Sequence, residues 1–164
     1  MLKKFSNNLK SFFLKLKEIN NITKRKPRFI FYSENKSYLK YGYSIIEYLS
    51  KKFPGEVYYI SSDVNDKVSD LNVINVYIGQ GFLLQNFFKS IETSNLFMTL
   101  TDLNNIVKRN NFVKNYIYFF HGAISTTRIY TSTAFDSYDT ILCNGDYQVK
   151  EIRQREKLVN LKEK

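Results

Sequence analysis

From Arg28 onward, short runs of apolar and aromatic residues alternate with stretches of helical periodicity. This alternation restricts the possible folds more than any other feature of the sequence. Strands that are apolar throughout, and that are separated by helices, are typical of a mainly parallel sheet covered on both faces. The pattern therefore predicts an α/β domain.

The apolar runs give the expected order of elements. In the first predicted helix, Ile45, Ile46, Leu49 and Phe53 share one face, and Pro54-Gly55 ends it. The chain of 164 residues has the size of one ordinary domain, so we expect a single Rossmann-like sheet. Strands are predicted at Phe29–Tyr32, Val57–Ile60, Val73–Ile78, Leu96–Leu100, Tyr116–Phe120 and Thr140–Cys143, and helices at Tyr43–Phe53, Phe82–Ile91 and Tyr147–Leu158.

Residues 1–28 differ from the rest of the chain in charge. They contain seven lysines and two arginines against Glu18 alone, so they carry +8 of the total net charge of +10. Their apolar residues recur at spacings of three and four, which predicts a basic amphipathic helix that stops near Asn20-Asn21 before a charged hinge at residues 24–28. We place the domain boundary there, with an arm at 1–28 and a domain at 29–164. The apolar residues of the arm are Leu2, Phe5, Leu9, Phe12, Phe13, Leu16 and Ile19.

The composition favours some partners over others. The arm has no apolar stretch of about 18 residues and no signal-peptide pattern, so we expect it to bind an anionic membrane surface or to pack on the domain. The aromatic residues fall in predicted strands and helix faces, where core packing explains them, so nucleic acid is not an expected partner. Cys143 is the only cysteine, which excludes an internal disulfide and favours a reducing, cytoplasmic setting.

In open α/β sheets, ligands bind beyond the carboxyl ends of the strands, so the residues after each predicted strand are the candidates for a site. The Gly79–Gly81 turn precedes a helix but lacks the full glycine-rich phosphate-binding fingerprint. The segments that follow the strands are Ser33-Glu34-Asn35, Ser61-Ser62-Asp63, Gly79-Gln80-Gly81, Thr101-Asp102, His121-Gly122 and Asn144-Gly145-Asp146.

His121 is the only histidine and follows the most strand-like run of the chain. An imidazole suits general acid–base chemistry near neutral pH, although a histidine in such a place is often a satisfied structural residue. Ser33, Glu34 and Asp102 are candidates for acceptor or phosphate binding, or alternatively serve as caps and loop residues. With one histidine and one cysteine, a zinc site has few possible ligands, so we expect no protein-bound metal.

Three segments resemble one known family in the order in which that family has them. They are Phe31–Tyr48, Tyr118-Phe119-Phe120-His121-Gly122, and Ala134–Cys143 followed by Lys150-Glu151-Ile152-Arg153. The chain from about residue 29 to residue 158 is similar to the CDP-glycerol glycerophosphotransferases, which include teichoic-acid polymerases and primases.

The resemblance implies the N-terminal, acceptor-side half of a GT-B transferase in which a C-terminal Rossmann-type domain, not represented in these residues, holds CDP-glycerol. His121-Gly122 matches the family's His-Gly motif, so His121 is the expected general base on the acceptor hydroxyl. The acceptor would be a lipid-linked or polymeric glycerol phosphate, at the cytoplasmic face of the membrane, in the synthesis of a cell-surface polymer. No cofactor is implied, and a nucleotide-binding domain in trans is an expected partner.

The sequence departs from the family after its His-Gly motif. Where the polymerases usually continue with Thr-Pro-Leu-Lys, this chain has Ala123-Ile124-Ser125-Thr126, so the nearest cation for a phosphate is Arg128. Two other functions remain open. One is a GT-B enzyme that uses a nucleotide sugar, and the other is a non-catalytic basic domain that binds anionic membrane or nucleic acid.

Overall fold

The fold is a six-stranded sheet in the order β3-β2-β1-β4-β5-β6, and all neighbouring strands are parallel. The computed structural model describes residues 2–164, and it describes side chains from Phe12 onward. This strand order is that of doubly wound Rossmann sheets, so the predicted α/β fold with a parallel sheet is confirmed. The strands are β1 (Phe29–Ser33), β2 (Val57–Ser61), β3 (Ile74–Tyr77), β4 (Thr93–Met98), β5 (Val113–Phe119) and β6 (Thr140–Leu142).

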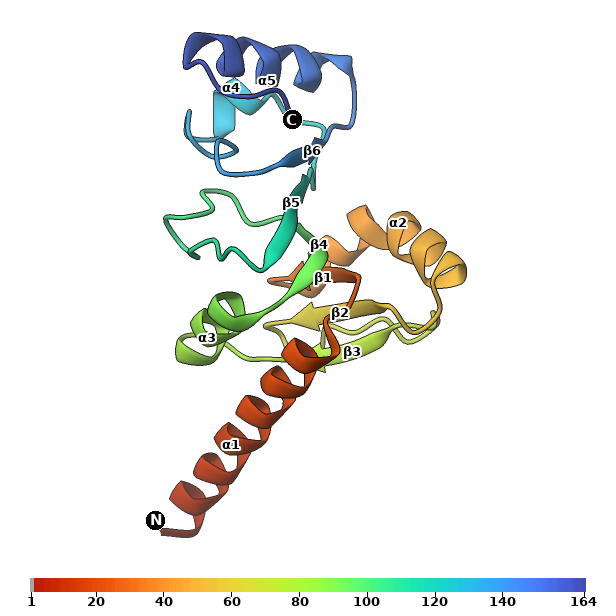
Figure 1. Ribbon diagram of the computed structural model, residues 1–164, viewed down its shortest axis with the longest axis vertical. Helices are drawn as coiled ribbons and strands as arrows, with labels where there is room; N and C mark the ends of the chain where they lie inside the picture. Colours follow the sequence, from red (N-terminus) through yellow and green to blue (C-terminus); the bar gives the residue numbers. More distant parts are fainter. Residues whose placement is uncertain (1) are drawn as a thin grey trace.

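Helices cover both faces of the sheet (Figure 1). The helix α2 crosses one face between β1 and β2, whereas α1 and α3 pack together on the other face, and α5 follows the edge strand β6. The connections from β2 to β3 and from β4 to β5 contain no helix. The helices are α1 (Leu2–Arg25), the short 3-10 turn η1 (Lys36–Tyr38), α2 (Leu39–Lys52), α3 (Phe82–Ser90), α4 (Thr126–Ile129) and α5 (Asp146–Leu158).

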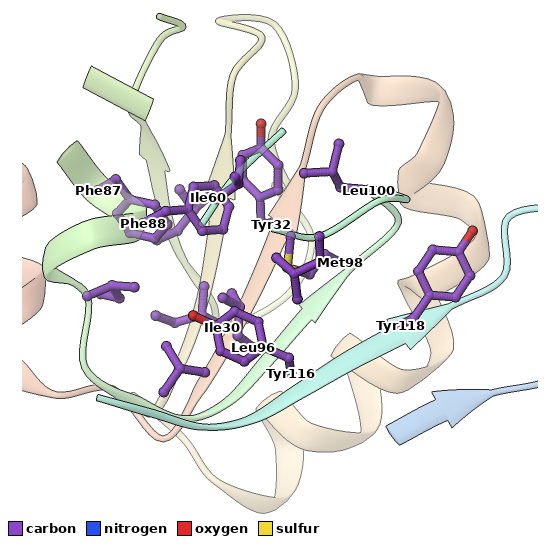
Figure 2. Close-up of a cluster of buried hydrophobic side chains, with 14 of the residues drawn as sticks. Ile30, Tyr32, Ile60, Phe87, Phe88, Leu96, Met98, Leu100, Tyr116 and Tyr118 are labelled. Atoms are coloured by element: carbon purple, nitrogen blue, oxygen red, sulfur yellow. The ribbon is translucent and has the colours of Figure 1, made fainter. Parts of the chain in front are cut away.

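Alternation along the strands divides the core into two layers. Phe31, Tyr59 and Phe119 face α2, whereas Ile30 and Tyr118 face the opposite side. Figure 2 shows the second layer, in which strand residues meet Phe87 and Phe88 of α3. Because both faces of β1 and β2 are buried, these strands are apolar or aromatic up to their final serine, which is why the sequence reveals them so clearly.

The C-terminal half of α1 belongs to this second layer. Ile19 and Ile22 are buried against the domain, and Arg25 donates to the Tyr58 hydroxyl at 3.3 Å. The predicted helix end near Asn20-Asn21 was wrong, because packing of Ile22 carries the helix to Arg25 and the chain turns at Lys26 with φ of 49°. Phe13 is 60% exposed. Within residues 2–164, no helix is both long and apolar enough to cross a membrane.

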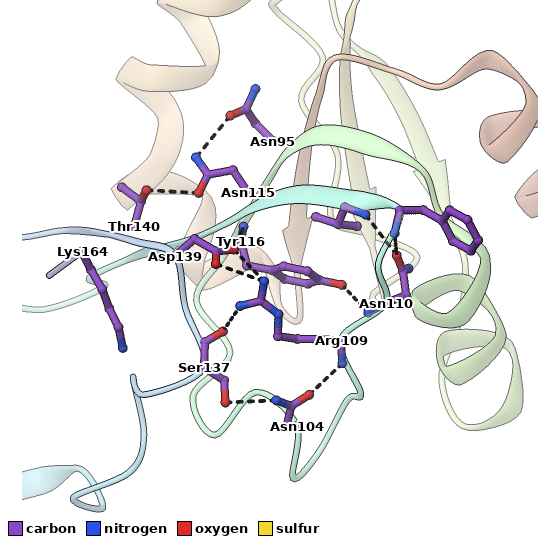
Figure 3. Close-up of polar contacts among 12 residues, drawn as sticks. Asn95, Asn104, Arg109, Asn110, Asn115, Tyr116, Ser137, Asp139, Thr140 and Lys164 are labelled. Atoms are coloured by element: carbon purple, nitrogen blue, oxygen red, sulfur yellow. Dashed lines mark hydrogen bonds and ion pairs between the residues drawn. The ribbon is translucent and has the colours of Figure 1, made fainter. Parts of the chain in front are cut away.

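A network around Arg109 ties the helix-free connection after β4 to the segment before β6 (Figure 3). The guanidinium binds Asp139 at 2.9 Å and the Ser137 carbonyl, and it lies 4.5 Å from the centre of the Tyr116 ring. Asp139 also accepts from the Tyr116 backbone N–H at 2.8 Å. These contacts fix the end of the long β5–β6 connection, which begins at Phe120 and includes His121.

Candidate functional site

The carboxyl ends of the strands lie along one edge of the sheet, and this edge contains the predicted site. The chain runs outward from β1 to β2 and β3 on one side, and from β4 to β5 and β6 on the other. The connections that leave β1 and β4 therefore diverge, and such a switch point is where open α/β sheets form a ligand crevice. We use the name His121 crevice for the part of this edge where Tyr38 and Tyr41 contact His121 and where Thr99 follows β4.

His121 lies directly beyond β5 and contacts two tyrosines from the connection after β1. Its ring centre is 4.7 Å from that of Tyr38 and 6.3 Å from that of Tyr41. Nδ1 is buried and has no hydrogen-bond partner among the described residues, which leaves Nε2 as the accessible nitrogen. Burial lowers the pKa of the imidazole from its ordinary value of 6.5, so the ring is neutral near neutral pH.

The η1 turn and the first turn of α2 bring the tyrosines to His121. The Asn35 side chain accepts from the Ser37 backbone N–H at 2.9 Å, and the Tyr38 N–H donates to the Asn35 carbonyl at 3.0 Å. Gly42 allows α2 to lie close to β5, because a Cβ atom there would stand 3.2 Å from the Phe119 ring. Short loop hydrogen bonds and one glycine thus place Tyr38 over the strand ends.

A small cavity lies beneath Tyr38. Its volume is about 10 Å³, enough for about one water molecule, and Ser33, Gly42 and Thr99 contribute to its wall. Thr99 follows β4 and is 2% exposed, and its hydroxyl has no partner among the described residues. Two buried polar atoms beyond the ends of β4 and β5, the Thr99 hydroxyl and Nδ1 of His121, are therefore not satisfied by the described residues.

Ser33, by contrast, is fully engaged inside the fold. Its hydroxyl donates to Asp66 Oδ2 at 2.6 Å, and the hydroxyls of Tyr59 and Ser61 donate to the same carboxylate at 2.9 Å and 3.0 Å. We call these four residues the Asp66 cluster. Since Ser33 is 4% exposed and its hydroxyl is used internally, the structure gives it a role in anchoring the β2–β3 connection.

Glu34 is half-buried, and burial raises the pKa of its carboxyl group. Burial is the main cause that raises the pKa of Tyr32, to about 12, and the charge of Glu34 adds to that shift. Burial also raises the pKa of Tyr118, where the Glu34 charge again contributes. Glu34 thus lies with the tyrosines of the α1 and α3 face, and no hydrogen bond joins it to His121.

The remaining predicted residues are dispersed. Asp102 has a φ of 55° and accepts from the Thr131 hydroxyl at 2.8 Å. The Gly122 carbonyl accepts from the side chains of Asn144 at 3.0 Å and Gln148 at 3.3 Å, which ties the turn after His121 to the start of α5. Arg128 is exposed on the four-residue helix α4, and no ion pair of the described residues includes it.

The sequence interpretation missed a larger cavity between α4, α5 and the end of the chain. Its volume is about 260 Å³, and its wall combines Tyr130, Phe135 and Leu158 with the ion pair of Arg155 and Asp136. Glu151 accepts from the backbone N–H and the hydroxyl of Thr126, whereas Oε1 of Glu156 in the same wall is buried without a partner among the described residues. The residues come from segments that lie apart in the sequence, and no short motif marks them.

Comparisons with known proteins do not add a family to this geometry. Neither models of protein families, nor curated proteins, nor solved structures gave a match to the chain. In the part of the chain that the structure describes, no three or more His, Cys, Asp or Glu side chains gather to hold a metal ion. The site is therefore interpreted from its own residues.

Proposed function

We propose that this chain is the acceptor-side domain of a glycerophosphotransferase that resembles the CDP-glycerol-dependent enzymes, with His121 as the general base. The observation that carries the proposal is the position of the only histidine of the chain, at the carboxyl end of β5 beside the switch point of the sheet, where burial lowers the pKa of its imidazole. A neutral imidazole can take a proton from an alcohol near neutral pH.

In the proposed reaction, Nε2 of His121 removes the proton of an acceptor hydroxyl as that oxygen attacks the phosphorus attached to glycerol. A new P–O bond forms to the acceptor, the P–O bond to CMP breaks, and CMP leaves with the electron pair. Holding the two substrates in line supplies much of the rate, and cations or N–H groups stabilise the charge on phosphorus.

Several features support this proposal beside the sequence resemblance. The His-Gly motif lies at the carboxyl edge of a Rossmann-like sheet, where such sheets bind ligands, and the resemblance assigns the nucleotide to a second domain. Of the residues suggested for the acceptor, Glu34, Asp102, Gly122 and Arg128 are at least partly accessible. We assign Ser33 to structure, because its hydroxyl is already engaged by Asp66.

The arm supports a peripheral position on an anionic membrane. Phe13 and Leu14 are 60% and 67% exposed on α1, and Phe82, 67% exposed, contacts Phe12 of the same helix. Exposed apolar side chains on a helix rich in lysine suit an interface with acidic lipid.

Deleting the arm would also remove Ile19 and Ile22 from the core, so the double variant Phe13→Asp with Leu14→Asp is the cleaner test of membrane binding. This double variant should pellet less with anionic vesicles; equal pelleting contradicts the membrane role.

The transfer reaction itself tests the main proposal. In a complete transferase that contains this chain, His121→Ala should lower CMP release from CDP-glycerol by roughly 100-fold, as expected for the loss of a general base. Gln80→Ala, an exposed residue after β3, is the control and should retain the parent rate. Turnover within a few-fold of the parent in the His121 variant, or release of CMP only with another acceptor class, contradicts the proposal.

A further inference from the structure

Packing, rather than a hydrogen bond, holds the imidazole of His121. A base that acts through Nε2 carries its own proton on Nδ1, and in many histidine sites a carboxylate or carbonyl accepts that proton and fixes the ring. Here Nδ1 is buried without an acceptor among the described residues. Something else must therefore define the plane of the ring.

The ring of Tyr38 is the closest aromatic contact of His121. The centres are 4.7 Å apart and the planes are inclined by 52°, whereas the Tyr41 ring is 6.3 Å away and edge-on. Tyr38 is half-buried, and its backbone is held by the Asn35 carbonyl at the start of α2. The charged residues of the connection after β1 are Glu34, Lys36 and Lys40, and Nζ of Lys40 lies 4.8 Å from the Tyr41 ring.

We infer that Tyr38 is the positioning residue for His121: its ring holds the imidazole at the end of β5 with Nε2 open to the crevice. As far as catalysis is concerned, this inference rests on the proposed function. Its structural part, the dependence of the imidazole on the Tyr38 ring, does not. The tyrosine hydroxyl is not required, so phenylalanine should serve as well.

The single histidine makes the inference directly measurable, because the chain gives one imidazole Hε1 resonance in proton NMR. In the parent chain this resonance should be displaced by the ring current of Tyr38 and should titrate below pH 6.5. Tyr38→Phe should leave both properties unchanged. Tyr38→Ala should abolish the ring-current displacement and move the midpoint up toward 6.5, because water then reaches the imidazole.

Two further variants separate the inference from a general effect on the fold. Tyr41→Ala should give a smaller change, and Tyr48→Ala, an exposed tyrosine 59% accessible on the same helix, should give none. If Tyr38→Ala does not fold, Tyr38→Leu keeps apolar bulk and should still lose the ring-current displacement. A Tyr38→Ala or Tyr38→Leu resonance with the parent shift and midpoint overturns the inference.

The catalytic part needs its own readout. In a complete transferase, Tyr38→Ala should lower kcat by roughly 10-fold with KM little changed, since a displaced base costs rate more than binding. Tyr38→Phe should restore the parent rate. If His121→Ala keeps full activity while the NMR results are as expected, the proposed function fails but the contact between Tyr38 and His121 stands. If His121→Ala is inactive while Tyr38→Ala keeps the parent rate, Tyr38 has no role in catalysis.

Discussion

The Asp66 cluster and the His121 crevice lie at the same edge of the sheet, but they differ in how far their buried polar atoms are hydrogen-bonded. In the cluster, three hydroxyls donate to one buried carboxylate. In the crevice, Nδ1 of His121 and the Thr99 hydroxyl are buried and unsatisfied by the described residues. The difference teaches that polar residues after a strand need not be ligand residues, since some of them complete the fold.

The comparison has an energetic meaning. A hydrogen bond to a charged group stabilises a fold by about 1.5 to 3 kcal/mol, whereas an unsatisfied buried polar atom destabilises it by about 1 to 3 kcal/mol. The Asp66 cluster should therefore support stability and contribute little to binding. The His121 crevice should do the reverse, because a ligand or an ordered water can satisfy atoms that the protein leaves open.

The largest expected effect is on the stability contributed by the Asp66 cluster. Asp66→Ala leaves three hydroxyl donors without their acceptor and should lower the free energy of unfolding by about 3 kcal/mol. This corresponds to a Tm lower by about 10 °C for a chain of this size. Glu56→Ala, which removes an exposed carboxylate before β2 with no hydrogen-bond partner among the described residues, is the control in thermal unfolding. Equal losses in the two variants would remove the distinction on which the comparison depends.

Two buried threonines provide a second test at a smaller scale. Thr126 Oγ1 donates to Glu151 at 2.6 Å, so Thr126→Val should cost about 1 to 2 kcal/mol. Thr99→Val replaces an unsatisfied hydroxyl by a methyl group of similar size, so stability should be unchanged or rise by about 0.5 kcal/mol. Urea unfolding measures both. A loss for Thr99→Val as large as that for Thr126→Val would show that the Thr99 hydroxyl has a partner, such as an ordered water.

The smallest effect is a pH dependence from His121. Its pKa in the folded chain is lowered by burial below the ordinary 6.5, so the unfolded chain binds the proton more readily. The resulting stability is present above about pH 6.5 and is lost as the pH falls through the folded pKa. The unfolding free energy of the parent should therefore fall more than that of His121→Ala between about pH 7 and 5. If the unfolding free energies of the parent and of His121→Ala fall equally over this pH range, the imidazole is not desolvated in the folded chain.

Much of the fold could be predicted because burial on both faces leaves apolar runs in the sequence. The amino ends of β4 and β5 could not, since Thr93 and Asn95 are polar. They pair with Val113 and Asn115, and an Asn95–Asn115–Thr140 chain of hydrogen bonds compensates for weak strand propensity (Figure 3). The helix α4, of four residues, carries too little periodicity to be found.

Only those residues of the candidate site that directly follow a predicted strand could be selected from the sequence. His121 follows a strand, and the rule of the carboxyl edge was enough to select it. The engagement of Ser33 was not predictable, because its acceptor Asp66 lies 33 residues away in a connection without regular structure. Tyr38 was not selected as a site residue, because only the approach of α2 to β5 at Gly42 brings it to His121.

The most direct test of the account is to map where an acceptor binds. A short glycerol phosphate oligomer is titrated into the isotopically labelled chain, and the backbone amide and imidazole shifts are followed by NMR. The account predicts saturable shifts around Tyr38, Tyr41 and His121, and little change at Asp66 and Ser61. Shifts confined to the 260 Å³ cavity between α4 and α5, or none at about 10 mM oligomer, would contradict the assignment of the His121 crevice as the acceptor site.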